Sequence, residues 1–495
     1  MTTAEQLVGQ LVSAGVDLAV DGNDLVFDGP AHAVDDETIA ALRTHKSAVL
    51  GLLTRNQDRG VVALGPTTVE QRRMELRGRM DRNAATYNVS VRVDIRSPVR
   101  PDLLDRAITS LVHRHEALRT RFAWYGEHLL QEVVQAPRTT VQVLPDGVLS
   151  DTTEDEVRQW CSRRGAAPFH LAAEPPARWC YAPMGHERGL LLVTMHHIVC
   201  DGWSIELLSN DLIALYRAEE DNDVAQLPPV TTTPRDFARW ELAWLTPERV
   251  AAARGFWAAE LDGATLAPVL TRATGKPATG GDADFVTRVL PVEVADRVAA
   301  LAREYATTEF SLYLAAFAML LGAETDGGDC AVVIAVANRT RQGHESVVGL
   351  CRNALPIRCS ARAGDPIDVV ARRISTHVLR AMERQTHPLG IIEPPAGDTG
   401  TDVRRLPFTF GFEAQDNLPV RCSRFELTVE DVYLGAARAE FSLLVKRRGE
   451  HLVAFFEYSK DQLEPEDAAR LADRYVQVLE HATRPAVPIP CDRGL

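Results

Sequence analysis

Two adjacent histidines, His196 and His197, are the side chains of this sequence best suited to acid–base chemistry. The unperturbed pKa of an imidazole lies near neutrality, so a fixed imidazole can take a proton from an amine or hydroxyl as that group attacks an acyl carbon. Asp201 and Gly202 follow shortly afterwards. A single histidine after a strand is more often a satisfied core residue than a catalytic one, so the surrounding elements must decide between the two interpretations.

The residues around the histidines predict a strand followed by a helix. Residues 190–193 are wholly apolar, which predicts a strand covered on both faces. Apolar residues then recur at helical spacing at Ile205, Leu208, Leu212, Ile213 and Tyr216. The histidines are therefore expected on a strand-to-helix turn. Because successive strand side chains face opposite ways, only one histidine can point into a given cleft while the other packs or orients it.

The string H-H-x-x-x-D-G-W-S over residues 196–204 resembles the motif of nonribosomal peptide synthetase condensation domains, in the superfamily of chloramphenicol acetyltransferase-like acyltransferases. Further segments resemble the same family in the same order: Thr68, Gln71, Arg73 and Met74; Tyr87 and Asn88; RHEALRTRF at 114–122; Asp236, Phe237, Ala238 and Trp240; Asn338 and Arg339; Val348, Gly349, Asn353 and Pro356; Phe456, Glu457, Tyr458 and Ser459. The resemblance covers about residues 62–484, nearly the whole chain beyond its first sixty residues.

Some positions depart from the family pattern. Glu75 stands where tryptophan is usual, and Ala354 replaces threonine. Residues 350–352, Leu-Cys-Arg, replace the usual F-F-V, and 387–389 are a reduced form of H-Q-x-x-P-F. Arg352 puts a cation beside what the family uses as a channel wall. It either alters acceptor choice or extends its guanidinium to solvent, and the second alternative is slightly favoured.

The resemblance implies an α/β (α+β) fold in which two chloramphenicol acetyltransferase-like lobes meet in a V, with the histidine turn at their junction. The expected domains are 65–232 for the N-terminal lobe, 233–485 for the C-terminal lobe and 486–495 for a tail or linker. Members of the family run a tunnel between the lobes. Donor and acceptor peptidyl carrier proteins bring substrates to it on phosphopantetheine arms, and the chain itself is expected to bind no cofactor.

The resemblance also implies roles for residues around the turn. His197 is expected to be the catalytic imidazole, His196 to hold the turn, and Gly202 to let the backbone approach the tunnel or to donate its N–H. Asp201 is expected to pair with Arg339 rather than to orient an imidazole as in a hydrolase triad. The residues expected to line the tunnel are Trp203, Ser204, Arg352 and Asn353, although Trp203 is equally compatible with plain core packing.

Residues 1–55 are predicted to be a separate small unit of order α-β-β-α, followed by a linker at 56–64. A hairpin turn at 21–24 lies between two short apolar runs, with helical patterns on either side. The unit resembles the tubulysin-type N-terminal docking domain, in which an exposed strand edge captures the C-terminal peptide of an upstream synthetase subunit. The residues expected to bind that peptide are Val20, Leu25, Val26 and Phe27. The alternative is an ordinary folded N-terminal cap.

Composition excludes several function classes. The net charge of -14 argues against nucleic acid as a partner. No apolar run approaches a membrane span and the N-terminus lacks a signal pattern, so no membrane partner is expected and the location is expected to be cytoplasmic. The eight cysteines are scattered, without a C-x-x-C pair or ligand spacing, which favours reduced thiols over disulfides or a metal site.

The predicted function is amide-bond formation by transfer of a carrier-bound acyl thioester to the amine of an acceptor aminoacyl carrier. A thiol nucleophile at Cys200 is disfavoured. Its neighbour Asp201 would have to assist it, and residues adjacent in the sequence rarely have the geometry of a nucleophile and its base. Two alternatives stay open. One is a free-standing acyltransferase of the same fold that acts on a free amine or alcohol, and the other is an inactive condensation-like recruitment platform, against which the intact histidine motif speaks.

Overall fold

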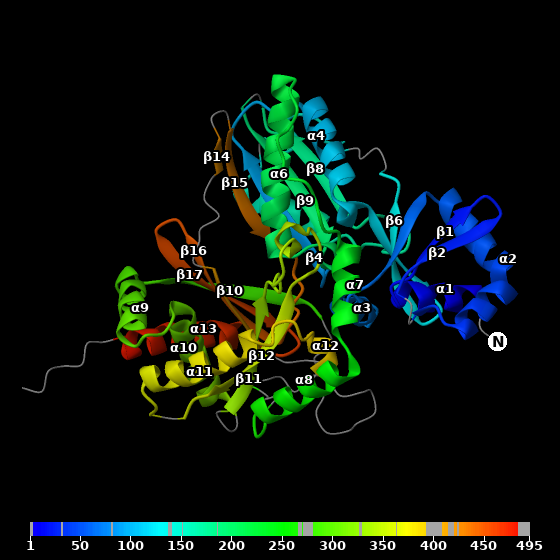
Figure 1. Ribbon diagram of the computed structural model, residues 1–495. Helices are drawn as coiled ribbons and strands as arrows, with labels where there is room; N and C mark the ends of the chain where they lie inside the picture. The colour runs from blue at the N-terminus through cyan, green and yellow to red at the C-terminus, as the bar shows by residue number, and fades with distance from the viewer. Residues whose placement is uncertain are drawn as a thin grey trace, which may run out of the picture.

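The computed structural model describes residues 3–30, 33–80, 83–136, 141–150, 152–185, 187–265, 270, 281–325, 329–362, 364–392, 408–413, 420–422 and 425–483. Within them lie two large mixed sheets that form an upper and a lower lobe in Figure 1, with a small unit at the N-terminus beside the upper lobe. The expected tail at 486–495 lies outside the described residues. The two-lobed α/β fold is confirmed.

The sheet of the N-terminal lobe has the strand order β14-β15-β4-β9-β8-β7. Its strands are β4 (Asn88–Ile95), β7 (Gln142–Val143), β8 (Ala177–Pro183), β9 (Gly189–His196), β14 (Val420–Cys422) and β15 (Phe425–Val432). The helices α4 (Pro101–Arg114) and α6 (Gly202–Asp221) cover one face of the sheet, and α5 (Glu154–Gly165) packs against the other.

All eight residues of β9 are buried, because this strand runs through the middle of the sheet between two layers of helices. Leu191, Val193 and Met195 pack in the cluster with α4 and α6. Leu190 and Leu192 pack in the cluster with α5. The strand covered on both faces that the apolar run predicts is therefore present, and it delivers His196 and His197 to its own end.

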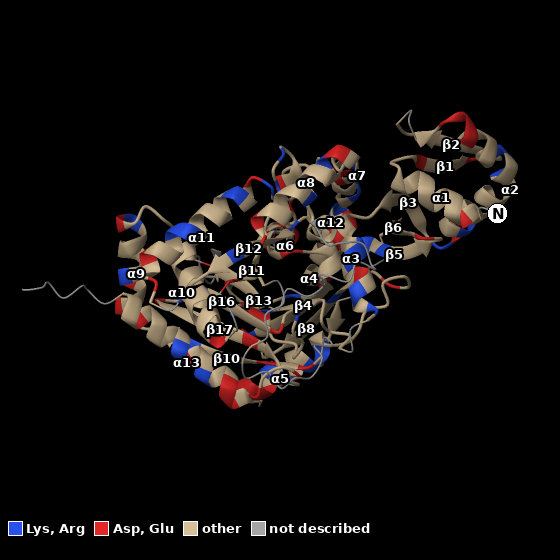
Figure 2. Cartoon of the chain, turned by 90° about the horizontal axis from the view of Figure 1, so that it is seen from below, with Lys and Arg blue, Asp and Glu red and all other residues tan. Residues whose placement is uncertain are grey.

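The sheet of the C-terminal lobe has the strand order β10-β17-β16-β13-β11-β12. Its strands are β10 (Ala283–Leu290), β11 (Asp329–Val336), β12 (Asn353–Ser360), β13 (Phe408–Glu413), β16 (Phe441–Arg448) and β17 (His451–Ser459). The helices of this lobe are α8 (Pro247–Glu260), α9 (Val292–Glu304), α10 (Glu309–Glu324), α11 (Ile367–Met382), α12 (Leu389–Ile392) and α13 (Pro465–Ala482). On the outer helices α9 and α13, acidic and basic residues lie side by side (Figure 2).

Helix α10 is the centre of the C-terminal core, with eleven of its residues buried. Helices that are apolar all round are buried ones, as the packing of Phe317 against Phe410 and Phe441 illustrates. No single helix in the described part of the chain is long and apolar enough to cross a bilayer. The helices α9 and α10 meet that criterion only as a pair, and they are bent by 110° relative to each other.

The predicted lobe boundary at 233 needs a correction. Helix α7 (Pro234–Trp244) begins there, with Thr233 as its N-cap. However, β14 and β15 come from the second half of the sequence and join the sheet of the first lobe, where β15 pairs antiparallel with β4. Each lobe is therefore not one continuous stretch of sequence, because 420–432 crosses over to complete the neighbouring sheet.

The N-terminal unit has the predicted α-β-β-α order: α1 (Ala4–Ser13), β1 (Asp17–Asp21), β2 (Asp24–Asp28) and α2 (Asp36–Asp58). The strands form a two-stranded antiparallel sheet in which Val20 lies opposite Leu25. Beyond this unit, β3 (Val61–Pro66), β6 (His128–Val134) and β5 (Thr120–Tyr125) make a three-stranded sheet, and α3 (Val69–Gly78) leads into the N-terminal lobe.

The linker predicted at 56–64 is wrong. Helix α2 continues to Asp58 and β3 begins at Val61, so only two residues separate them. The amide of Asn56 donates to the Tyr125 hydroxyl over 2.7 Å. Helix α1 approaches the β5–β6 hairpin so closely that a Cβ at Gly9 would lie 2.3 Å from the Tyr125 carbonyl oxygen. The unit therefore shares one core with the three-stranded sheet and is not flexibly tethered to it.

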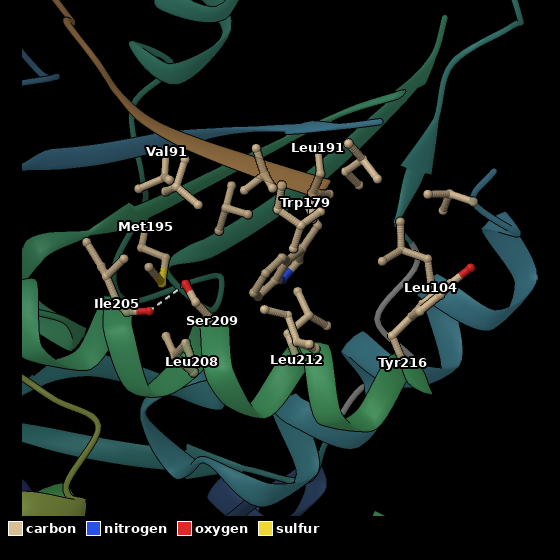
Figure 3. A pocket seen from close by; sticks show the side chains of 17 residues that line it. Val91, Leu104, Trp179, Leu191, Met195, Ile205, Leu208, Ser209, Leu212 and Tyr216 are labelled. Atoms are coloured by element: carbon tan, nitrogen blue, oxygen red, sulfur yellow. Dashed lines mark hydrogen bonds between the residues drawn. The ribbon is translucent and has the colours of Figure 1, made fainter. Parts of the chain in front are cut away.

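A small apolar cavity of about 100 Å³ lies inside the N-terminal lobe, between α6 and the sheet (Figure 3). Trp179 projects into it from β8, and Leu208, Leu212 and Tyr216 close it from α6. The Trp179 indole N–H is buried without a hydrogen-bond acceptor among the described residues. Ser209, one of the few polar residues lining this cavity, donates its hydroxyl to the Ile205 carbonyl of its own helix.

Candidate active site

The turn after β9 fixes both histidines by backbone contacts. Residues His197–Val199 form a short 3-10 helix (η3), and Asp201 caps the N-terminus of α6 by accepting from Ser204 N over 2.9 Å. The His197 N–H donates to the Tyr87 carbonyl over 2.7 Å, which ties the turn to the residue just before β4. The catalytic candidates therefore lie on a turn held at both ends, as a site that needs defined geometry requires.

His197 lies on the wall of a cavity of about 700 Å³ between the two lobes. Its Nδ1 is 2.5 Å from the Cys200 carbonyl oxygen. A carbonyl can only accept a hydrogen bond, so we assign the proton of the neutral ring to Nδ1, which leaves the Nε2 lone pair available. Burial lowers the pKa of His197 well below its usual range, and the Arg352 and Arg438 guanidiniums lower it further. The imidazole is thus neutral at physiological pH.

His196 is turned away from this cavity. Its Nδ1 accepts from Ile198 N over 3.1 Å, and its ring lies against the rings of Tyr87 and Phe169. Burial, with a smaller contribution from Arg438, lowers the pKa of His196 to about 3. The two histidines thus divide into one that faces the cavity and one that packs, as strand alternation predicts, and His196 acts on the geometry of the turn.

Asp201 and Arg339 form a bidentate ion pair, 2.8 and 3.0 Å long, whose side chains are 1% and 2% exposed. The carboxylate also accepts from Ser204 Oγ and from the backbone N–H groups of Cys351 and Arg352. The ion pair expected from the sequence is therefore present, and the Asp201 oxygens are all engaged. Since the contact of His197 Nδ1 is the Cys200 carbonyl, the geometry is not that of a hydrolase triad.

The four residues expected to line the tunnel separate into two pairs. Arg352 and Asn353 line the cavity. The amide of Asn353 also donates to the Gln385 carbonyl over 2.9 Å and to the His387 carbonyl, so it holds the segment that precedes α12. The side chain of Arg352 lies along the cavity wall, as the tunnel-lining prediction requires, and it is half-buried there, so its extension to solvent stays a prediction.

Trp203 and Ser204 do not line the cavity, which corrects the expectation for both. Trp203 is 44% exposed, and its indole donates to the Glu345 carbonyl over 2.9 Å. Ser204 is buried, and its hydroxyl accepts from Gly349 N over 3.0 Å. Both residues begin α6 on the side that faces the C-terminal lobe, so they fasten the lobes together instead of touching substrate space.

Gly202 lines the cavity together with His197. A Cβ built at Gly202 meets no atom within 4 Å, and its backbone is not in the left-handed region. Neither packing nor backbone conformation demands glycine here. A side chain at this position would instead project into the free volume beside the imidazole, so glycine keeps that volume open.

Two cavity residues were missed by the sequence reasoning. Arg438 lies between β15 and β16, donates from Nε to the Thr86 carbonyl over 3.1 Å and lowers the pKa of both histidines. Burial raises the pKa of Glu457 on β17 to about 7. Glu457 belongs to a matched motif, whereas nothing in the local sequence marks Arg438, because only the crossover of β15 brings it to the turn.

Other chemistries receive no support from the geometry. Burial raises the pKa of the Cys200 thiol far above its usual range, with Asp201 adding to the effect, so a nucleophilic thiolate is disfavoured. No cluster of three metal-ligating side chains occurs among the residues that the structure describes.

Comparison with known proteins decides the family. The family model of the condensation domain matches residues 64–488. The chain belongs to the condensation domain family. Condensation domains of nonribosomal peptide synthetases are acyltransferases that form peptide bonds, and the α/β fold found here agrees with that assignment.

Curated relatives of this condensation domain include phosphinothricin tripeptide synthetase PhsC of Streptomyces viridochromogenes, 28% identical over 83% of the chain and 38% of the relative. Malpinin synthetase of Mortierella alpina is 24% identical over 92% of the chain and 6% of the relative. The chain thus spans less than half the length of these relatives.

Two solved structures have the same fold. The first condensation domain of the calcium-dependent antibiotic synthetase gives a TM-score of 0.73 at 22% identity, covering 86% of this chain and 98% of that one. The X-domain from teicoplanin biosynthesis gives a TM-score of 0.72 at 23% identity, covering 84% and 94%.

Proposed function

We propose that this condensation domain transfers an acyl or peptidyl group from the phosphopantetheine thioester of a donor carrier protein to the amine of an acceptor aminoacyl carrier protein. The acceptor nitrogen bonds to the acyl carbon, the carbon–sulfur bond breaks, and the thiol leaves with a proton. The observation that carries this proposal is a neutral imidazole, held by its Nδ1–H, on the wall of a large cavity built from both lobes.

His197 Nε2 acts on the amine in this proposal. A neutral imidazole accepts a hydrogen bond from the attacking N–H and orients the nitrogen lone pair toward the thioester carbon. Because burial and two arginines hold its pKa low, His197 by itself is a weak base. Orientation and hydrogen bonding of the amine are therefore the main contributions of His197. Proton removal by His197 becomes important only if the charges of the neighbouring arginines are neutralised, which would raise its pKa.

The test is a condensation assay by intact-protein mass spectrometry with an aminoacyl donor carrier and an aminoacyl acceptor carrier. We expect a dipeptide on the acceptor carrier with the wild type and a fall of about 10²-fold or more with His197→Ala. His113→Ala, which changes an exposed histidine on α4, is the matched control and should keep wild-type activity.

The same assay separates the alternatives. Transfer to a free amine or alcohol but not to a carrier-bound amine would assign the chain as a free-standing acyltransferase. Absence of transfer to any acceptor would favour a recruitment platform. The proposal also places the reaction in the cytoplasm, in keeping with the buried free thiols of the described cysteines.

We further propose that the N-terminal unit docks the C-terminal peptide of an upstream synthetase subunit along its two-stranded sheet. Val26 and Phe27 support this, because they are 48% and 41% exposed, whereas Val20 and Leu25 pack partly against the core. A two-stranded sheet has free edges that a peptide strand can extend.

Calorimetry with C-terminal peptides of candidate upstream subunits tests this docking role. Val26→Asp should abolish binding, and Val224→Asp, at an exposed valine after α6, is the matched control. Equal affinities of the wild type and Val26→Asp would leave the unit as an ordinary folded cap.

A further inference from the structure

Arg352 is placed beside the catalytic turn by its own backbone. Its N–H donates to Asp201 Oδ2 over 3.1 Å, the same oxygen that receives Arg339 Nη1. That buried ion pair therefore fixes the Cα of Arg352 relative to the turn. From this anchored position the side chain lines the cavity that His197 and Gly202 also line.

Most of the other charged side chains of this cavity have charged or hydrogen-bonding partners, and Arg448 lies over the Phe455 ring. Glu70 pairs with Arg73 over 3.2 Å and accepts from Gly390 N, while Glu413 and Asp431 share Lys446 at 2.8 Å each. Arg438 donates to a carbonyl oxygen. The Arg352 guanidinium, in contrast, makes no hydrogen bond or ion pair with any side chain in the described part of the molecule. The charges that act on it are Arg438 and Arg73, which repel it, and Glu70 and Asp201, which attract it from a distance.

A guanidinium in this setting is a receptor for an anion. Burial and the Arg438 charge lower the pKa of Arg352 only to about 10, so it remains charged at neutral pH. Its planar fork of N–H donors matches the two oxygens of a carboxylate, and such charge-assisted pairs gain strength when water is partly excluded. Holding the charge in a cavity without a counterion costs free energy, which an arriving carboxylate would offset.

We propose that Arg352 binds a carboxylate of the substrate beside His197, so that the reaction takes an acidic substrate. The acid is either the side chain of a carrier-bound residue or the α-carboxylate of a free amino-acid acceptor. This inference rests on the proposed function, because it names the substrate class of the same cavity. Arg352 is then a specificity-determining residue at a position where the family pattern has an apolar one.

The same contact links substrate charge to the imidazole. Arg352 is the larger of the two charges that lower the pKa of His197, and a bound carboxylate would cancel much of that effect. An acidic substrate would thereby raise the pKa of His197 toward neutrality and make the ring a better proton acceptor. An otherwise identical neutral substrate would leave the ring a weak base.

Binding measurements test the inference without requiring turnover. In one arm, non-hydrolysable aminoacyl-pantetheine amides carrying Asp, Glu, Asn or Gln are titrated by calorimetry. In the other arm, free alanine is compared with alaninamide. We expect the acid to bind about 10- to 100-fold more tightly than its amide in one arm, which identifies the source of the carboxylate.

Variants of Arg352 give the decisive comparison. In Arg352→Val the acid-to-amide ratio should fall to about one, and in Arg352→Lys part of the preference should return. Arg448→Val is the matched control, since Arg448 lines the same cavity but is not among the charges that act on His197. A ratio near one in both arms of the wild type, or a preference that survives Arg352→Val, would overturn the inference.

Transfer assays separate this inference from the proposed function. If neutral substrates are condensed and acids show no preference, the proposed function stands and the Arg352 inference fails. If acids bind through Arg352 but no amide forms with any pair, the binding site stands and the proposed function fails. With acidic substrates, the lower pKa in the pH profile of kcat, which reports the enzyme–substrate complex, should lie higher than with their amides, and Arg352→Val should remove that difference.

Discussion

The cavity between the lobes and the cavity inside the N-terminal lobe share one wall residue, Ile205, but differ in size and chemistry. The first has about 700 Å³ and is lined by acidic and basic residues as well as His197. The second has about 100 Å³ and is lined almost wholly by aliphatic and aromatic side chains. Helix α6 serves both, with Gly202 at its start facing the large cavity and Leu208 and Leu212 facing the small one.

The difference separates a site from a packing gap. The small cavity arises within one lobe and has almost wholly apolar walls. The walls of the large cavity come from both lobes, and the buried ion pair between Asp201 and Arg339 joins them. The charged residues of the large cavity can interact with a ligand, whereas the small cavity offers mainly apolar contacts and the Trp179 indole N–H, which has no acceptor among the described residues.

Filling the large cavity beside His197 should have the largest effect, a loss of transfer activity. Gly202→Leu places an isobutyl group beside His197, at a position where an added Cβ meets no atom within 4 Å. We expect transfer activity to fall about 100-fold or more because the substrates lose access to the imidazole, while the fold is kept. Mass-spectrometric transfer assays and thermal unfolding measured together check this. Normal activity in Gly202→Leu would show that the substrates do not pass this residue.

Breaking the ion pair between Asp201 and Arg339 should have the next largest effect, a loss of stability. Arg339→Leu leaves the Asp201 carboxylate buried without its counterion, which should lower the free energy of unfolding by about 3 to 5 kcal/mol. Arg358→Leu is the matched control, since its pair with Asp329 is partly exposed and should contribute about 1 kcal/mol or less. Urea denaturation of both variants measures the contrast, and equal losses would contradict it.

Joining the two cavities tests the wall that they share. Ile205→Ala removes the side chain that lines both, and we expect a loss of about 2 kcal/mol, the low end for such truncations because Ile205 is only half-buried. Ile205→Val should cost about 1 kcal/mol or less. Chemical denaturation measures both variants, and a loss for Ile205→Ala no greater than for Ile205→Val would show that the wall closes up after truncation.

Acid should lower stability through the histidine turn beside the large cavity and not through the small cavity, whose described lining contains no histidine or carboxylate. The pKa of His196 is lowered to about 3, so below the unfolded value of about 6.5 the unfolded chain takes up a proton that the folded chain does not. Stability is therefore fully present above about pH 6.5 and is lost as the pH falls below it.

Each such histidine contributes a slope of about 1.4 kcal/mol per pH unit between those two pKa values. In His196→Asn the Oδ1 can replace Nδ1 as the acceptor for Ile198 N, so the slope should fall by that amount. Unfolding curves between pH 7 and pH 5 measure it, with His113→Ala as the control. An unchanged slope in His196→Asn would mean that His196 titrates normally.

The turn that carries His196 and His197 was predictable because its determinants are local. The apolar run 190–193, the helical spacing after Ser204 and the capping aspartate all lie within one stretch of sequence. Strand alternation then separated His196 from His197 before any tertiary contact was known. The α-β-β-α order of the N-terminal unit was predictable for the same reason, since its hairpin signal at 21–24 is local.

What only the tertiary structure decided depends on partners far away in the sequence. The linker prediction failed because β3 pairs with β6, whose residues lie about seventy positions later, and because Asn56 finds Tyr125 across that distance. The predicted lobe boundary was wrong because β15 completes the sheet of the other lobe. The same crossover brings Arg438, which follows β15, toward the turn. Trp203 and Ser204 lie away from the cavity, contrary to expectation, because the packing of the two lobes, and not residue type, determines which side chains line it.

The sequence by itself therefore determined the chemistry available, an imidazole on a turn at the end of a buried strand, and the class of fold that presents it. The tertiary structure alone determined the electrostatic surroundings of that imidazole, including the guanidinium of Arg352, which is unpaired among the described side chains. The physical reason is that secondary structure follows from the periodicity of neighbouring residues, whereas a charge acts through space on whatever the chain brings near it.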